Sequence, residues 1–263
     1  MNDIWRVFNC NNFFYDILRK DIKAFEHKYQ IEYPDANAGN TLLVTRDDLF
    51  AVIEQQQKVG NYEKVFIESI ITTENFLKDV SLVIYKDFPN KLTIGITEQE
   101  SDKRESKLLS IIINSFDKDE MLAKLTEEKI RGIFYGSPTD FFIKDTAKIG
   151  LAKFFADNHH KTLEKFTEII ARRNIFIHNN GKVDRKYLCE VKNPAFELGN
   201  KAVISYKYLK ETIMILKALS LLVTDIAVRK NYNAVPNKKY LMGSKSQTKG
   251  SKYNYTNHKL ARV

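Results

Sequence analysis

The chain has 263 residues, of which 43% are hydrophobic and 29% are charged, and its formal net charge is +9. This composition is typical of a soluble globular protein with a sizeable core, and it includes no run of the roughly 18 apolar residues that a membrane helix requires. Because Asp3 stands in a start without an apolar run, we expect no signal peptide, no membrane association and a cytoplasmic location.

The first 104 residues have the pattern of an N-terminal helical region. Apolar residues three and four positions apart predict amphipathic helices over 13–29 and 62–85. The apolar face of the first contains Phe13, Phe14, Ile17, Leu18, Ile22 and Phe25, and the expected buried side of the second contains Phe66, Ile67, Ile70, Ile71, Phe76 and Leu77. Between them, Thr45 and Asp48 form a capping-box pattern that opens a helix ending near Gln57, before a break at Gly60 and Asn61.

Two shorter features complete this region. We expect a loop over 34–40 and one short strand over 92–96. Residues 97–106 are the only long polar run inside the body of the sequence, and we interpret them as a linker or exposed loop. The linker separates the region 1–104 from a second helical domain over 105–232.

The second domain is also predicted to be helical, with helices over 107–116, 118–133 and 140–156. Asn158 is a candidate cap for the next helix, which should end at Asn179-Asn180-Gly181 because Asn and Gly tolerate the left-handed backbone that stops a helix. A loop over 181–201 follows, with short extended pieces at 187–188 and 202–205. The last helix, over 206–230, is apolar around most of its circumference, so we expect it to be buried in the core or against a second subunit.

The positive charge is concentrated at the C-terminal end. Nine of the 42 basic residues lie in 226–263, which contain no Asp or Glu, so the remaining 33 basic residues balance the 33 acidic ones. We expect 233–263 to form a flexible basic tail, because few of its residues are apolar. The tail could bind RNA phosphates or serve only as a solubilising extension. The candidate RNA-binding residues are Lys238, Lys239, Lys245, Lys249 and Lys252.

The most informative stretch is Arg172-Arg173-Asn174-Ile175-Phe176-Ile177-His178, near a predicted helix end. Arginine offers a rigid fork of donors to phosphate oxygens. Histidine is the residue type that both accepts and donates a proton near neutral pH. Together they provide what cleavage of a phosphodiester needs when no metal takes part.

The spacing by itself is weak evidence, because chance gives about half an occurrence in a chain of this composition. Its flanks add weight, since Asn174 follows the arginine pair, a helix stop follows His178, and a long apolar helix comes later. This combination resembles the HEPN superfamily, whose members share a helical bundle and a motif of Arg, often followed by Asn, with His four to six residues later. The match is Arg173-Asn174, three residues and then His178, and it covers about 105–232.

The resemblance implies an all-α, HEPN-like bundle that acts as a metal-independent endoribonuclease without a cofactor. It also implies a homodimer that brings two motifs to one cleft, with Arg173, Asn174 and His178 as the candidate catalytic residues. Enzymes of this family often act in toxin or phage-defence systems. An inhibitor, an antitoxin or a defence-system protein is therefore an expected partner, in addition to the RNA substrate.

Helical geometry places the motif residues on different faces. Asn174 and His178 share a face, whereas Arg173 lies about 140° away from His178. We expect Arg173 to reach around the helix end or toward the partner's phosphate site, and Asn174 to orient His178 or the phosphate. Arg172 is expected to pair with Glu168 four residues earlier, and both have supporting roles.

Other interpretations stay open. The chain could be a catalytically silent HEPN-like module that binds RNA or nucleotides, or a helical interaction or scaffold protein in which Arg173 and His178 are structural. Residues 157–164 include two histidines at partial metal-ligand spacing, but no third ligand on that face is clear, so we expect no metal site. Cys10 and Cys189 are far apart, which argues against a disulfide framework or a zinc cluster.

Overall fold

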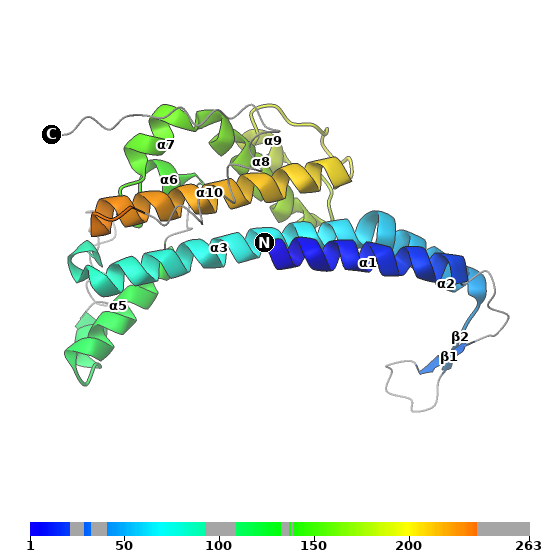
Figure 1. The fold of residues 1–263 in the computed structure, drawn as a ribbon, viewed down its shortest axis with the longest axis horizontal. Coiled ribbons are helices and arrows are strands. Elements are labelled where there is room, and N and C mark those ends of the chain that lie inside the picture. Colours follow the sequence, from blue (N-terminus) through cyan, green and yellow to red (C-terminus); the bar gives the residue numbers. More distant parts are fainter. Residues whose placement is uncertain (22–28, 33–40, 93–108, 133–136, 138, 236–263) are drawn as a thin grey trace. The chain divides into compact units, whose positions relative to one another are not determined.

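The computed structural model describes residues 1–21, 29–32, 41–92, 109–132, 137 and 139–235 (Figure 1). The described helices are α1 (Asn2–Asp21), α2 (Arg46–Gln55), the π-helix η2 (Gln56–Gly60), α3 (Asn61–Asp87), the 3-10 helix η3 (Pro89–Leu92), α5 (Lys118–Gly132), α6 (Asp140–Ile143), α7 (Ala152–Asn158), α8 (His160–Asn179), α9 (Arg185–Glu190) and α10 (Tyr206–Tyr232). Residues 109–113 are also helical. The predicted all-α class is confirmed.

One short antiparallel hairpin is the exception to the helical pattern in the described residues. Its strands are β1 (Tyr29–Glu32) and β2 (Thr41–Val44), with Tyr29 opposite Val44. The prediction of helix through Tyr29 is therefore wrong at that residue. None of the helices in the described ranges is both long enough and apolar enough to cross a membrane.

The chain forms two compact units, each built from two separate segments. Unit 1 contains Met1–Thr72 and Ala171–Ile213, and unit 2 contains Thr73–Ile170 and Met214–Val263. Each unit therefore combines segments from both sides of the expected boundary between residues 104 and 105. That boundary, the polar run 97–106 and residues 93–96 of the predicted strand lie outside the described residues, so the three-part division stays a prediction. Leu92, the first residue of that strand, lies in η3 instead.

In unit 1, α2 and η2 run back along α1 (Figure 1). Three side-chain contacts fix this antiparallel arrangement: Arg19 to Glu54 at 3.6 Å, Gln57 to Asp16 at 2.7 Å and Asn61 to Asn12 at 3.0 Å. The predicted capping box opens α2, because the Thr45 hydroxyl accepts from the amide of Asp48 and the Asp48 carboxylate accepts from the amide of Thr45. The Thr45 hydroxyl also donates to the Asp48 carboxylate at 2.6 Å, and this bond, together with the one from the Thr45 amide, lowers the pKa of the Asp48 carboxyl.

The helix α1 differs from its prediction in both its start and its contacts. It begins at Asn2, and its first half is anchored by Trp5 and Phe8, whose rings pack against Tyr206. Phe8 is fully buried, whereas Phe13 and Phe14 are exposed. The inward face of α1 thus carries polar residues that bind α2, η2 and the start of α3. The described members of the predicted apolar face, Phe13, Phe14, Ile17 and Leu18, are exposed instead, and Ile22 and Phe25 lie outside the described residues.

The expected break at Gly60 and Asn61 is wrong, because the chain stays helical from α2 through η2 into α3. Asn61 is buried and its amide donates to Asn12. A Cβ at position 60 would lie 2.6 Å from Gln56 Oε1, the far end of a flexible side chain that can move aside, so this contact does not require glycine. A π turn is a common way to fit one extra residue into a continuing helix.

The buried side of α3 is confirmed in part. Phe66, Ile70 and Leu77 are fully buried, but Ile71 and Phe76 are 43% and 36% exposed. The helix ends at Asp87 before Pro89, as predicted, because proline restricts the residue in front of it.

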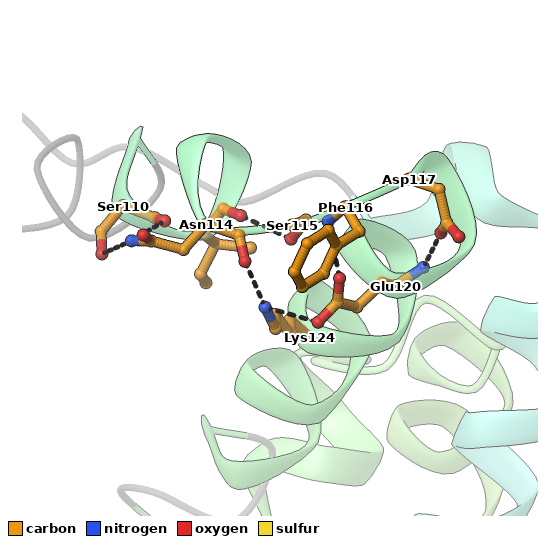
Figure 2. A network of polar contacts seen from close by, with 8 residues as sticks. Ser110, Asn114, Ser115, Phe116, Asp117, Glu120 and Lys124 are labelled. Atoms are coloured by element: carbon orange, nitrogen blue, oxygen red, sulfur yellow. Dashed lines mark hydrogen bonds and ion pairs between the residues drawn. The ribbon is translucent and has the colours of Figure 1, made fainter.

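In unit 2, the helix predicted over 107–116 ends at residue 113, and a network of polar contacts links its end to α5 (Figure 2). Residues 107 and 108 lie outside the described residues. The Glu120 carboxylate accepts a hydrogen bond of 2.6 Å from the Phe116 amide, and the Asp117 carboxylate accepts one of 2.8 Å from the Glu120 amide. Lys124 joins Glu120 to the Asn114 carbonyl. This network ends one helix and opens α5, which confirms the helix predicted over 118–133 across its described residues, 118–132.

The single helix predicted over 140–156 is wrong, because a turn separates α6 from α7. Asp145, Lys148 and Gly150 have φ angles of 50°, 54° and 100°, which a helix does not permit. The Asp145 carboxylate accepts hydrogen bonds from the amides of Ile149 and Gly150 and so stabilises the turn.

Asn158 does not cap α8, because it is the last residue of α7 and its amide donates to the Phe154 carbonyl. The aromatic core of unit 2 closes around Phe142, whose ring packs on Phe155 and Phe166 at centroid distances of 4.9 and 5.3 Å.

The end of α8 is confirmed. Asn180 and Gly181 have left-handed φ angles of 50° and 79°, which end the helix, and the Gly181 amide donates back to the Ile175 carbonyl at 2.9 Å. The extended piece expected at 187–188 is wrong, because both residues lie in α9. Residues 202–205 are in neither helix nor strand, and the predicted last helix corresponds to α10.

We predict that Gly181→Ala destabilises the protein more than Gly199→Ala. Both glycines have φ near 80°, which costs an alanine about 1 kcal/mol. A Cβ at position 181 would also lie 3.0 Å from the Phe176 ring, whereas nothing lies within 4 Å of one at position 199. Urea unfolding should give losses of about 2–4 kcal/mol and about 1 kcal/mol, respectively. Equal losses would show that the Phe176 contact does not constrain the turn.

Candidate functional site

A cleft of about 230 Å³ lies in unit 1 between the second half of α8 and the helix α9. Its lining residues are Ala171, Asn174, Ile175, His178, Asp184, Lys186, Tyr187 and Glu190. Of the predicted catalytic residues, the structure brings Asn174 and His178 together here, one helical turn apart on the same face. The imidazole of His178 is exposed in the last turn of α8 and is open to a ligand.

The apolar wall of the cleft belongs to the core of unit 1. Ala171 and Ile175 of α8 and Tyr187 of α9 are all at least 98% buried. They pack in one cluster with Val183, Val191 and Ala202. Because this cluster joins the two helices, the face that carries Asn174 and His178 is held in a fixed relation to α9.

Asp184 connects the end of α8 to the start of α9, and the sequence analysis missed it. One carboxylate oxygen accepts from the Asn179 side-chain amide and the other accepts from the Tyr187 backbone amide, both at 2.7 Å. The second bond makes Asp184 the N-cap of α9. An Asp three residues before Tyr187 is a typical helix N-cap, and this pattern could have predicted α9. The expectation of an extended piece at 187–188 excluded a helix there.

The cleft contains charges of both signs. Lys186 and Glu190 form an i, i+4 pair at 3.8 Å, and the lysine side chain is 70% exposed. Such an exposed pair contributes little to stability, so the ammonium group can turn to a ligand at small cost. Asp184 has both oxygens engaged by hydrogen bonds. His178 and Lys186 are therefore the groups in this cleft that suit an anionic ligand.

Arg172 is a structural residue in unit 1. It is 95% buried, its guanidinium lies 3.7 Å from the centre of the Tyr208 ring and 4.8 Å from that of Phe196, and it donates to the Val203 carbonyl at 3.3 Å. These contacts join α8 to the loop after α9 and to α10. Arg172 does not line the cleft, and its predicted pairing with the half-buried Glu168 stays a prediction.

Arg173 also lies outside the cleft that His178 lines. Its side chain is half-buried and its Nε atom is buried. This position agrees with the helical geometry, which separates Arg173 from His178 by about 140°. Within one chain, the arginine and the histidine of the motif therefore do not share the described cleft.

The other histidines of this helical region have local contacts of their own. His159 packs against Phe154 and Phe155, and burial lowers its pKa. The exposed His160 lies 3.4 Å from the Glu164 carboxylate. Among the residues that the structure describes, no group of three or more His, Cys, Asp or Glu is placed to hold one metal ion. The five candidate lysines of the tail lie outside the described residues.

Comparison with known proteins gives no match: no family model, no curated protein and no solved structure is significantly similar to this chain.

We predict that Arg172→Ala destabilises unit 1, because it removes the cation–π contacts with Tyr208 and Phe196 and leaves a buried cavity. The expected loss is about 2–4 kcal/mol by urea unfolding. Arg185→Ala is the matched control, since Arg185 is exposed at the start of α9 and its loss should change stability by less than about 0.5 kcal/mol. An equally stable Arg172→Ala protein would contradict the structural assignment.

Proposed function

We propose that this protein is a metal-independent endoribonuclease in which each chain contributes one His178 cleft to a composite active site. The observation that carries the proposal is that Asn174 and His178 share an open cleft beside Lys186. The HEPN-like spacing of Arg173, Asn174 and His178 supports the same reaction class. A role as a toxin or phage-defence effector in the cytoplasm rests on that resemblance alone.

The proposed reaction is an internal transesterification of RNA. A base removes the proton of a 2′-hydroxyl, the oxygen attacks the neighbouring phosphorus, and an acid protonates the departing 5′-oxygen. The products carry a 2′,3′-cyclic phosphate and a 5′-hydroxyl. The exposed imidazole of His178 is the candidate for either proton transfer.

A single histidine cannot easily act on both sides of one phosphorus, so the proposal requires a second copy. The size of the cleft agrees with an incomplete site. Its volume of about 230 Å³ is below the roughly 300–1,000 Å³ that is usual for small-molecule sites. One cleft therefore suits a single phosphate and its sugar, whereas a dinucleotide needs more surface.

The remaining side chains have distinct proposed roles. Asn174 lies one turn before His178, where its amide can bind a phosphate oxygen or hold the imidazole. Lys186 supplies a positive charge at the cleft. Because Arg173 lies outside its own chain's cleft, we propose that it stabilises charge on the non-bridging oxygens at the partner's half of the site.

One observation favours a second candidate function. The absence of Arg173 from the lining of the cleft also fits a HEPN-like module that binds RNA or nucleotides without cleaving them. Such a module would retain affinity for RNA but would release no new ends.

We predict that the purified protein cleaves total RNA in the presence of EDTA, because the proposed chemistry uses no metal. His178→Ala and Arg173→Ala should each lower the cleavage rate at least about 100-fold, and Asn174→Ala about 10-fold. His160→Ala is the matched control: this histidine is also exposed but lies at the other end of α8, so its loss should have no effect. The fragments should carry 2′,3′-cyclic phosphates.

Two outcomes would contradict the nuclease. Loss of cleavage on adding EDTA would indicate metal chemistry. RNA binding without new ends, in the wild type and in His178→Ala alike, would support the silent module instead.

We also predict that excess His178→Ala protein inhibits the wild type, because a mixed dimer has only one of the two required histidines. With random pairing and about a threefold excess of the variant, activity per wild-type chain should fall about fourfold. Activity proportional to the wild-type concentration alone would show that one chain is sufficient.

A further inference from the structure

One face of α1 carries a row of exposed side chains, which we call the α1 stripe: Val7, Cys10, Phe13, Phe14, Ile17 and Leu18. Its five apolar members are 56%, 63%, 59%, 38% and 47% exposed, in sequence order, and Cys10 is also exposed. Helices of globular proteins normally bury such a face. Here the core of unit 1 does not use it.

The opposite face of α1 already holds the helix in unit 1. Phe8 is fully buried there, and Asn12, Asp16 and Arg19 contact the chain that runs back from α2 to α3. The α1 stripe is therefore not a misplaced core face of the same unit. It is a second apolar surface on a helix that is anchored without it.

The spacing of the stripe is that of a helix-pairing seam. Positions 7, 10, 14 and 17 alternate steps of three and four, as the apolar positions of paired helices do, and Phe13 and Leu18 flank the seam. Asp3 and Asp21 lie on the same face at its two ends. An apolar centre with a charged rim is the anatomy of a protein–protein interface.

We propose that the α1 stripe is the surface through which two copies of this chain pair. Its apolar side chains expose roughly 500 Å² at a full area of about 150–250 Å² per large side chain, so two copies would bury about 1,000 Å². This is the size at which specific interfaces begin. A two-fold axis would place the stripe against itself, as in other symmetric dimers.

The choice of a second copy as the occupant rests on the proposed function, which requires two chains. The α1 stripe also belongs to unit 1, the unit that contains the His178 cleft. Another exposed apolar group, Leu109, Ile112, Ile113 and Phe116, lies in unit 2. That group is therefore in the unit that does not contain the His178 cleft.

The first test measures mass in the absence of RNA. Because the area is at the lower limit for a stable complex, the wild type should change from monomer to dimer as its concentration rises from about 1 to 100 μM in sedimentation experiments. The double variant Phe14→Glu/Ile17→Glu should stay monomeric over the same range. Ile113→Glu, a charge on the other exposed apolar group, should pair like the wild type.

The second test uses Cys10 as a reporter and does not depend on charge variants. In a Cys189→Ser background, labelling of Cys10 by a maleimide should slow at least about tenfold as the chains pair, because the stripe is then buried. In the matched Cys10→Ser background, the exposed Cys189 should label at a rate that is independent of protein concentration.

The outcomes separate this proposal from the proposed function. Two results would overturn the α1 stripe as the interface but not the composite site. The first is a Phe14→Glu/Ile17→Glu protein that still forms dimers. The second is a rate of Cys10 labelling that does not change with protein concentration although the mass doubles. Pairing through the stripe in a protein that does not cleave RNA would support the interface and overturn the nuclease. A wild type that stays monomeric would overturn the pairing and the shared site together.

Discussion

The left-handed turn after α8 is the constraint on which the candidate site depends. Gly181 reverses the chain with its amide bonded to Ile175, and Asp184 then uses one oxygen for Asn179 and the other for the first turn of α9. If the chain turned elsewhere, α9 would not cover Ala171 and Ile175, and no cleft would lie beside His178. The same turn leaves His178 exposed, because it ends α8 one residue later. Helix termination therefore produces both the pocket and the accessible imidazole.

The two adjacent arginines of the motif have different surroundings in unit 1. Arg172 is buried in the core of unit 1, where its guanidinium packs against the rings of Tyr208 and Phe196. Arg173, one residue later, is rotated by about 100° around the helix and is only half-buried. Loss of activity on replacing Arg172 would consequently report on folding as much as on chemistry. Arg173 and His178 are the informative pair, and their separation on α8 is the physical reason to invoke a second chain.

The sequence predicted those features that local chemistry alone determines. The capping box at Thr45 and the stop at Asn180 depend on a few neighbouring atoms, and both are present. Predictions failed where a side chain binds backbone amides and so changes the course of the chain. They also failed where the position of a second helix determines the local structure. Asp145 opens a turn by binding two amides, and Asp184 starts a helix in a segment assigned as extended. Periodicity identified Asn174 and His178 as neighbours, but it could not foresee a cleft whose other wall comes from α9.

Periodicity also identifies the apolar face of a helix but not the surface against which that face packs, and α1 is an example. Phe13 and Phe14 have the spacing of core residues, yet Phe8 and three polar side chains hold α1 in place. A chain can retain such an apolar surface at little cost in solubility if a second surface covers it at working concentration. The cleft at His178 is likewise smaller than the usual range for small-molecule sites. The proposed pairing of two chains would account for both the uncovered helix face and the small cleft in the same unit.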